Sequence, residues 1–220
     1  LALELAAKFS AEILNCDSLQ LYRGFDVGTA KTPASGRRGI AHHLLDVLDP
    51  ENGYSAGEYA RHAREVIGQI AERGRVPIIV GGTGFYLRAL LEGLPELPER
   101  DEAVRARLAA REKKHPGSLH RLLARLDAAA GARIHSNDVQ KLIRALEIRL
   151  LTRSNLPARE FAEPLRGYRV LKLGLDPDRK RLVERLDERV QAMFSGGLLD
   201  EVRGLLAGGA TGREKPFESL

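Results

Sequence analysis

The stretch VPIIVGGTGFYLRALLEG, residues 76–93, decides the expected fold. Its first five residues form an apolar run without alternating polar side chains, which is typical of a central strand in a parallel sheet that is covered on both faces. The sequence Gly-Gly-Thr-Gly follows, and apolar residues at helical spacing come next. Strand, glycine turn and helix in this order predict an α/β fold.

Other segments of the first 90 or so residues fit the same architecture. The runs AEILNC (11–16) and HHLLDVLD (42–49) read as short strands. Ser55 and Glu58 form a capping-box pattern, which predicts a helix that starts there and ends at Gly74.

The part from Pro95 to Ser154 shows no strand pattern, only helical segments with Arg-rich faces. The sheet is expected to resume at YRVLKLGL (168–175), after a loose linker over 156–167. Asp176 and Pro177 then predict the N-cap and first position of a helix that ends at Gly196–Gly197. We therefore expect an α/β core made of 1–94 and 155–220, and a helical insertion over 95–154.

Composition narrows the class of protein. Hydrophobic residues make up 43% and charged residues 30% of the 220 residues, which fits a globular chain and neither a disordered nor a membrane protein. The net charge of +5 permits a polyanionic partner without requiring one. The lone cysteine, Cys16, rules out an internal disulfide and favours a buried structural thiol in a cytoplasmic protein.

Two features could carry chemistry at the carboxyl ends of the expected strands. Asp17 follows the strand 11–16, where it could be a functional carboxylate or a common turn residue. The Gly-Gly-Thr-Gly turn could present backbone N–H groups to a phosphate, with help from Thr83. Glycines also serve simple close packing, so both interpretations of this turn stay open.

Two basic helix faces could bind RNA or phosphate. In QKLIRAL the side chains of Gln140, Lys141 and Arg144 share the face opposite the apolar stripe. They could bind RNA phosphates and bases, although such a face more commonly is simply exposed to solvent. Another helix carries an arginine every four residues, alternating with acids, which favours an ion-paired exposed helix. These arginines are Arg181, Arg185 and Arg189.

Five blocks of the sequence together resemble the tRNA dimethylallyltransferase family. They are collinear and span nearly the whole chain: DSLQLYRGFDVGTAK, HHLLDVLDP followed by YSAGEY, VPIIVGGTGFYLRALLEGL, ARIHSNDVQKLIRALE and LDERVQAMFSGGLLDEV. The resemblance implies a phosphate-loop-NTPase-like parallel sheet core with a helical insertion. It also implies transfer of a dimethylallyl group from dimethylallyl diphosphate to the exocyclic amine of the adenosine 3′ of the anticodon in tRNA. Mg²⁺ as cofactor, the tRNA anticodon stem-loop as partner, a monomer, and no membrane partner are implied as well.

The resemblance also assigns roles to individual positions of this chain. Asp17 falls on the family's general base, and Thr83 on the threonine near the reacting centre. Gly82 and Arg189 fall on positions expected to bind the diphosphate, and no metal ligand is implied within this chain. Contacts to tRNA are implied for Asp17, Ser18, Leu19, Gln20, Thr83, Arg105, Gln140, Lys141, Leu142, Ile143 and Arg144.

The sequence lacks one motif of the resembled family and leaves two alternative activities open. No GxxxxGK[ST] phosphate loop occurs in these residues. We expect it upstream of Leu1, so that the 220 residues alone would be inactive. A phosphate-loop kinase of a small metabolite is one alternative, and the basic helical insertion argues against it. An adenylate isopentenyltransferase that acts on free nucleotides is the other.

Overall fold

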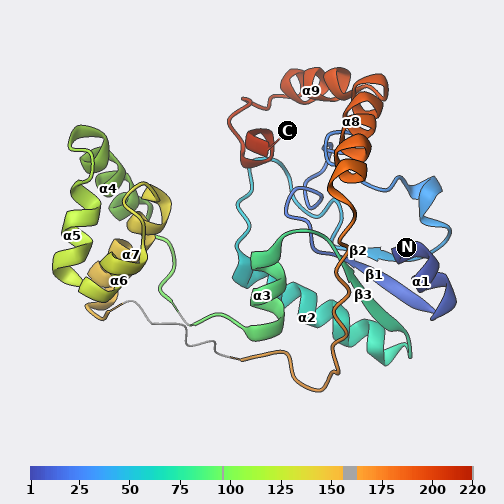
Figure 1. The fold of residues 1–220 in the computed structure, drawn as a ribbon, viewed down its shortest axis with the longest axis horizontal. Coiled ribbons are helices and arrows are strands. Elements are labelled where there is room, and N and C mark those ends of the chain that lie inside the picture. The colour runs from blue at the N-terminus through green and yellow to red at the C-terminus, as the bar shows by residue number, and fades with distance from the viewer. Residues whose placement is uncertain (96, 156–162, 220) are drawn as a thin grey trace. The chain divides into compact units, whose positions relative to one another are not determined.

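The computed structural model describes residues 1–95, 97–155 and 163–219 (Figure 1). The chain divides into two compact units, which we call the core unit and the insertion unit. The core unit is Leu1–Gly93 together with Glu163–Leu220, and the insertion unit is Leu94–Ala162. The helical insertion predicted over 95–154 falls within the second of these units.

The core unit contains three parallel strands in the order β2-β1-β3. They are β1 (Ala11–Asn15), β2 (His42–His43) and β3 (Val76–Val80). All five residues of β1 pair in register with the five residues of β3, so both strands end at the same level. The strand β1 is buried throughout, whereas both end residues of β3 are exposed.

Two strand predictions are corrected by this arrangement. In the described sheet β1 is the middle strand, so the central position expected for 76–80 is wrong; an apolar run does not distinguish a middle strand from an edge strand that is partly covered. Of the strand expected over 42–49, only β2 forms, with an isolated parallel bridge between Tyr22 and Leu48. Leu44 and Asp46 have positive φ angles, 56° and 55°, which interrupt the extended conformation.

The strand expected over 168–175 is also absent from the described structure. All of these residues are exposed, and no neighbouring described strand supplies a ladder of hydrogen bonds for them. The helix that follows, α8 (Arg179–Ser195), starts later than expected because Asp178, not Asp176, accepts hydrogen bonds from the first backbone N–H groups. Its end before Gly196 is confirmed. Residues 156–162 of the expected linker lie outside the described part of the chain.

Helices cover the sheet of the core unit. The capping box predicted for α2 is confirmed, since the Ser55 hydroxyl accepts from the Glu58 N–H and the Glu58 carboxylate from the Ser55 N–H. The helix α1 packs on the sheet face that carries Ala11 and Ile13. The remaining bounds in this unit are α1 (Ala2–Lys8), the 3-10 turn η1 (Ala34–Arg37), α2 (Ala56–Glu72), α3 (Gly84–Glu92), α9 (Leu198–Ala207) and η2 (Lys215–Ser219).

The insertion unit is helical, as its sequence predicts. The helical segment 118–134 is divided into two helices at Asp127, whose side chain caps the second of them. Leucines from α4, α5 and α7 form its hydrophobic core. The helices are α4 (Glu102–Lys114), α5 (Ser118–Leu126), α6 (Ala128–Arg133) and α7 (Val139–Thr152).

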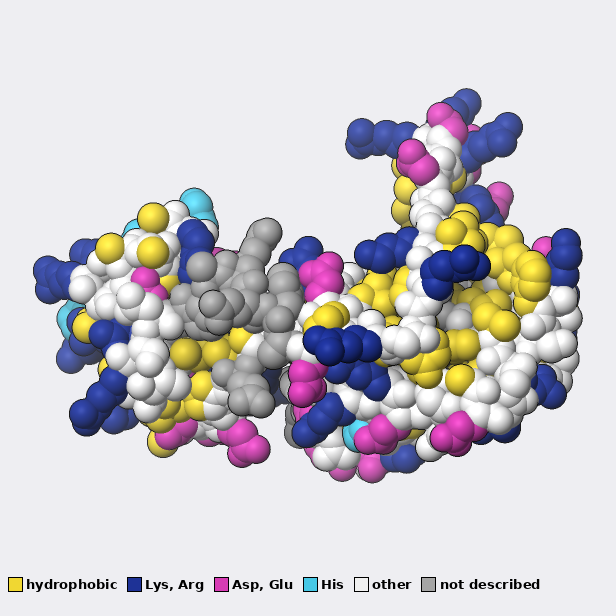
Figure 2. All heavy atoms as spheres, turned by 90° about the horizontal axis from the view of Figure 1, so that it is seen from below, with side chains coloured by type: hydrophobic (Ala, Val, Ile, Leu, Met, Phe, Trp, Pro, Cys, Tyr) yellow, Lys and Arg dark blue, Asp and Glu magenta, His cyan; other side chains and the backbone are white. Residues whose placement is uncertain are grey.

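The surface carries both basic and apolar groups. In Figure 2, lysine and arginine side chains lie on the visible faces of both units. Hydrophobic side chains are also exposed on the visible face of the core unit. Throughout the part of the chain that the structure describes, every helix is too short or too polar to cross a membrane.

Candidate functional site

Asp17 and Thr83 lie on neighbouring loops at the carboxyl ends of β1 and β3. The Thr83 N–H donates to the Cys16 carbonyl at 3.1 Å, and the Ser18 N–H donates to the Thr83 hydroxyl at 3.0 Å. The Cys16 N–H donates to the Val80 carbonyl at 2.7 Å, which extends the ladder past the end of β1. The two residues expected to share one sheet edge are therefore tied together by hydrogen bonds between their loops.

Gly81 permits this close approach. A Cβ atom at that position would lie 2.3 Å from the carbonyl carbon and oxygen of Cys16 and 2.8 Å from the Asp17 nitrogen. Real Cβ atoms do not come so near to backbone, so only glycine fits. By contrast, open space surrounds the Cβ positions of Gly82 and Gly84. The first glycine of the turn thus serves packing, while the next ones leave room beside the N-terminus of α3.

The backbone N–H groups at the start of α3 could bind an anion. Thr83 is the N-cap residue of this nine-residue helix, but its hydroxyl bonds the Ser18 N–H and makes no side-chain hydrogen bond to its own helix. The first N–H groups of α3 consequently receive no cap from the Thr83 side chain. Such groups, with the helix dipole, favour a phosphate oxygen.

Hydrogen bonds fix the orientation of the Asp17 carboxylate and, within the described residues, leave one of its oxygens without a donor. Its Oδ1 accepts a hydrogen bond from the Leu19 N–H at 2.8 Å, and its backbone N–H donates to Asn15 Oδ1 at 3.0 Å. The Asn15 amide also donates to the carbonyls of Asp17 and Leu44. In the described structure Asp17 Oδ2 accepts no hydrogen bond, so this oxygen is free to take a proton from a ligand.

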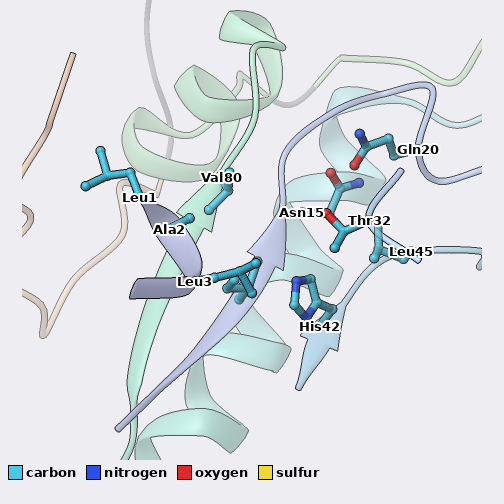
Figure 3. Close-up of a pocket in the computed structure, with 10 residues that line it drawn as sticks. Leu1, Ala2, Leu3, Asn15, Gln20, Thr32, His42, Leu45 and Val80 are labelled. Carbon is cyan, nitrogen blue, oxygen red and sulfur yellow. The ribbon is translucent and has the colours of Figure 1, made fainter. Parts of the chain in front are cut away.

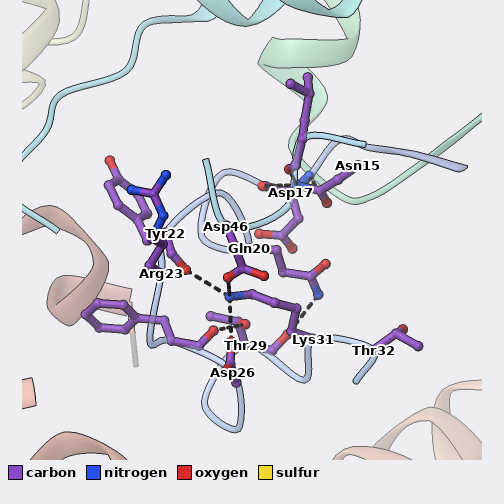
Figure 4. A network of polar contacts seen from close by, with 12 residues as sticks. Asn15, Asp17, Gln20, Tyr22, Arg23, Asp26, Thr29, Lys31, Thr32 and Asp46 are labelled. Carbon is purple, nitrogen blue, oxygen red and sulfur yellow. Dashed lines mark hydrogen bonds and ion pairs between the residues drawn. The ribbon is translucent and has the colours of Figure 1, made fainter. Parts of the chain in front are cut away.

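A polar network lies next to this carboxylate (Figure 4). The side chain of Lys31 is 3% exposed, and its Nζ donates to Asp26 Oδ1 at 2.6 Å, to Asp46 Oδ1 at 2.5 Å and to the Tyr22 carbonyl at 2.8 Å. A buried ammonium requires such partners, because burial without them is costly. Lys31 was not among the predicted site residues, although its place in the Gly-Thr-Ala-Lys turn was a signal.

A cavity of about 250 Å³ opens beside the same segment (Figure 3). Polar side chains of Asn15, Gln20, Thr32 and His42 line it, together with apolar residues of α1 and β3. Because Asn15 also holds Asp17, the cavity and the strand-end site share a wall.

Buried aromatic rings support the site within the core unit. The rings of Tyr59 and Tyr86 stack with centroids 4.5 Å apart, and the Tyr59 hydroxyl donates to the Asn15 carbonyl at 3.0 Å. Burial raises the pKa of the Tyr59 hydroxyl and of the Cys16 thiol. The prediction that Cys16 is a buried structural thiol is confirmed.

In the insertion unit, three of the predicted RNA contacts gather around one buried carboxylate. Glu147 has a fully buried side chain and accepts from Arg144 Nη1 at 2.6 Å, Arg105 Nη1 at 3.3 Å and the Asp101 N–H at 2.7 Å. Gln140 Oε1 accepts from Arg105 Nη2 at 3.4 Å. Burial opposes the charge on Glu147, but hydrogen bonds from Arg144 and the Asp101 N–H outweigh it and lower its pKa.

Glu147 was missed in the sequence, although it follows the apolar residues of the same helix face. Three other predicted RNA contacts lie close by with different exposure. Lys141 is exposed and pairs with Asp138, whereas Leu142 and Ile143 belong to the hydrophobic core. The side chains of these two apolar residues are therefore not on the surface of the unit.

Arg189 lies on the exposed helix α8. No hydrogen bond or ion pair joins it to Asp17 or Thr83 within the described residues, so its predicted role at the diphosphate stays a prediction. The ion pairs expected along its helix are absent too, since no described pair joins side chains of α8 to one another.

A parallel sheet with a polar site at its strand ends and an inserted helical unit defines an α/β protein. Residues 20–220 match the family model described as IPP transferase. The chain therefore belongs to the IPP transferase family.

Individual relatives agree with this assignment. A tRNA dimethylallyltransferase of Solibacter usitatus is 60% identical over all of this chain and 72% of its own length. A solved full-length tRNA isopentenylpyrophosphate transferase from Bacillus halodurans superposes with a TM-score of 0.65 at 35% identity, covering 99% of this chain and 68% of that one. A eukaryotic dimethylallyltransferase solved acting on tRNA gives a TM-score of 0.76 at 27% identity, over 99% of this chain and 55% of that one.

Proposed function

We propose that the protein transfers a dimethylallyl group from dimethylallyl diphosphate to the exocyclic amine of the adenosine 3′ of the anticodon in tRNA. Membership of the IPP transferase family and the names of the relatives support this activity. The observation that carries it is the hydrogen-bonded pairing of the Asp17 and Thr83 loops at one sheet edge. An adenine placed at this edge would lie next to the free carboxylate oxygen of Asp17 and the hydroxyl of Thr83.

Asp17 would act as the general base. The exocyclic amine of adenine is a poor nucleophile, because its lone pair is delocalised into the ring. As the amine nitrogen forms its bond to the allylic carbon, the bond from that carbon to the diphosphate oxygen breaks and Asp17 Oδ2 takes the amine proton. A positioned base typically contributes on the order of 10²- to 10⁴-fold.

The leaving diphosphate needs positive charge. Two groups of this chain could supply it: the backbone N–H groups at the start of α3 and the exposed side chain of Arg189. The open space at Gly82 would leave room for the diphosphate. Mg²⁺ bound to the diphosphate would neutralise part of its charge.

The RNA would be held at two places. Ser18, Leu19 and Gln20 adjoin the proposed base, where the target nucleotide must be unstacked at a cost of about a few kcal/mol. In the insertion unit the predicted contacts with accessible polar side chains are Arg105, Gln140, Lys141 and Arg144. Their attraction to phosphates can offset the cost of unstacking.

Two further properties belong to the proposal. We expect a cytoplasmic enzyme, in agreement with a single cysteine that is free and buried. We also expect a monomer. The kinase and the free-nucleotide transferase are not favoured, since the relatives carry names of tRNA-modifying enzymes.

The activity is tested with the full-length protein, Mg²⁺, dimethylallyl diphosphate and an anticodon stem-loop RNA. Mass analysis should find one dimethylallyl group on the RNA, and none when guanosine replaces the target adenosine. Transfer to AMP in preference to RNA would instead support the free-nucleotide enzyme, and phosphoryl transfer from ATP to a small metabolite would support the kinase.

The role of Asp17 is tested separately. Asp17→Asn should keep the hydrogen bond from the Leu19 N–H, because the amide oxygen can accept it, and should lower turnover by about 10²- to 10⁴-fold. Asp49→Asn is the matched control, since Asp49 pairs only with the exposed Arg23 in the described structure. Turnover of Asp17→Asn at the level of the control would refute the base assignment.

A further inference from the structure

Helix α9 holds the loop that follows the Asp17 segment. The side chain of Glu201, in the first turn of α9, accepts three hydrogen bonds from consecutive backbone N–H groups. Oε2 accepts from Asp26 at 2.8 Å and from Val27 at 2.7 Å, and Oε1 accepts from Gly28 at 3.0 Å. Each of these bonds is charge-assisted and therefore stronger than a neutral one. A single carboxylate thus fixes the backbone of a whole turn.

Apolar contacts from the same part of the chain reinforce this attachment. The position of a Cβ at Gly24 lies 2.9 Å from Leu205 Cδ2, so α9 packs directly on the backbone there. The fully buried ring of Phe25 meets Phe217 edge-on, with centroids 5.0 Å apart. In Figure 1 the blue loop after β1 lies below α9 and beside α8. The C-terminal helices are therefore attached to the loop at several points.

The loop is in turn bonded to the segment that begins at Asp17. The Gln20 side-chain amide donates to the Thr29 carbonyl at 3.0 Å, one residue beyond the turn held by Glu201 (Figure 4). Lys31 bonds both the carboxylate of Asp26, the first residue of this turn, and the carbonyl of Tyr22, which precedes it. The three bonds of Glu201, together with those of Lys31, therefore help to hold the partner of Gln20 in place.

We propose that Glu201 is a positioning residue, which holds the 26–28 turn so that Gln20 is presented to the RNA. The inference rests on the proposed function, because Gln20 is a predicted RNA contact. Asp17 itself is oriented by Asn15 and the Leu19 N–H, which are independent of this turn. Loss of Glu201 should therefore weaken the binding of RNA more than it slows the transfer step.

The proposal predicts a specific pattern for Glu201→Gln in the full-length protein. The amide oxygen can replace one carboxylate oxygen, but its NH₂ group would face a backbone N–H. Hydrogen exchange of the amides of 26–28 should accelerate by about tenfold, and the KM for the stem-loop RNA should rise by about three- to tenfold. The value of kcat at saturating RNA should stay within about twofold of the wild type.

Asp200→Asn is the matched control, because Asp200 is adjacent, exposed, and paired only with Arg203 in the described structure. It should change neither exchange at 26–28 nor KM. Glu201→Asp provides a second variant that keeps the charge but shortens the side chain, and it should also accelerate exchange and raise KM.

Several results would overturn the proposal. Wild-type exchange at 26–28 in both Glu201 variants would do so, and so would a fall in kcat with an unchanged KM. If the wild-type protein fails to modify the RNA at all, the proposed function is refuted. The exchange data then still decide whether Glu201 holds the turn.

Discussion

The Ser18 backbone N–H donates a hydrogen bond to the Thr83 hydroxyl at 3.0 Å, joining residues 65 positions apart in the sequence. It links the loop after β1, which carries Asp17, to the turn after β3. The hydroxyl that is expected near the reacting centre therefore also fixes the neighbour of the expected base.

Replacement of Thr83 separates these two roles. Thr83→Val keeps the shape but removes the acceptor, which leaves the Ser18 N–H unpaired and should cost about 0.5–1.5 kcal/mol of stability. Turnover should also fall, because the loop that carries Asp17 is less fixed. Thr83→Ser retains the hydroxyl and should lose much less on both counts. Urea unfolding and single-turnover rates measure the two effects, and equal behaviour of both variants would argue against the role of this hydrogen bond.

Gly81→Ala should disturb the strand ends directly. The new Cβ would overlap the Cys16 carbonyl group, so the two loops must move apart. We expect a loss of about 1–3 kcal/mol in the free energy of unfolding, together with reduced turnover. Gly53→Ala, at an exposed glycine with no atom within 4 Å of its Cβ position, is the control and should be close to neutral in urea unfolding. Equal stability of the two variants would show that the backbones can separate without cost.

Glu147→Gln should destabilise the insertion unit. The carboxylate that pairs with Arg105 and Arg144 is lost from a buried position, at a cost of about 1–3 kcal/mol. Binding of the stem-loop RNA should weaken as well, because both guanidinium groups lose their common partner. Chemical unfolding and RNA titration measure these effects. The exposed Glu102→Gln serves as control, and a Glu147→Gln variant that matches it would contradict the role of the buried carboxylate.

Glu12 predicts how stability depends on pH in the core unit. Its hydrogen bond with Arg73 lowers its pKa to about 2, against the opposing effect of burial and with help from His43. A lowered carboxylate pKa stabilises the fold above the ordinary value near 4.5, and this contribution is lost as the pH falls toward about 2.

The free energy of unfolding of Glu12→Gln should accordingly lie below that of the wild type at neutral pH, and the difference should shrink in acid. Urea unfolding of both proteins across this pH range measures it, with the exposed Glu4→Gln as control. A difference that is constant with pH would show that the ionised form of Glu12 is not the one stabilised.

The sequence predicted those parts of the fold that local patterns determine. The capping box at Ser55 and the strand 76–80 with its glycine turn follow from residue spacing, and the structure contains both of them. The wrong predictions concern features that depend on contacts with distant parts of the chain. Whether 168–175 forms a strand depends on a neighbour for its hydrogen bonds, and the middle position of β1 depends on how three separate segments pair.

The candidate site shows the same division. Asp17 and Thr83 were expected at one sheet edge because each follows a recognisable strand within a few residues, and their roles in catalysis stay predictions. Glu147 and Glu201 could not be predicted, because their importance lies in partners that are distant in the sequence or buried with them. An isolated acid in a helix gives no sign that it will meet three backbone N–H groups of another segment.

The stacked pair Tyr59–Tyr86 has a practical consequence for spectroscopy. The chain contains five tyrosines and no tryptophan, so its ultraviolet emission comes from phenol rings alone. Two of these rings lie in contact under the strand ends, where Tyr59 touches the Asn15 carbonyl. Loosening of this region should therefore change the phenol fluorescence, and a tryptophan introduced at a chosen surface position would emit at longer wavelength without native background.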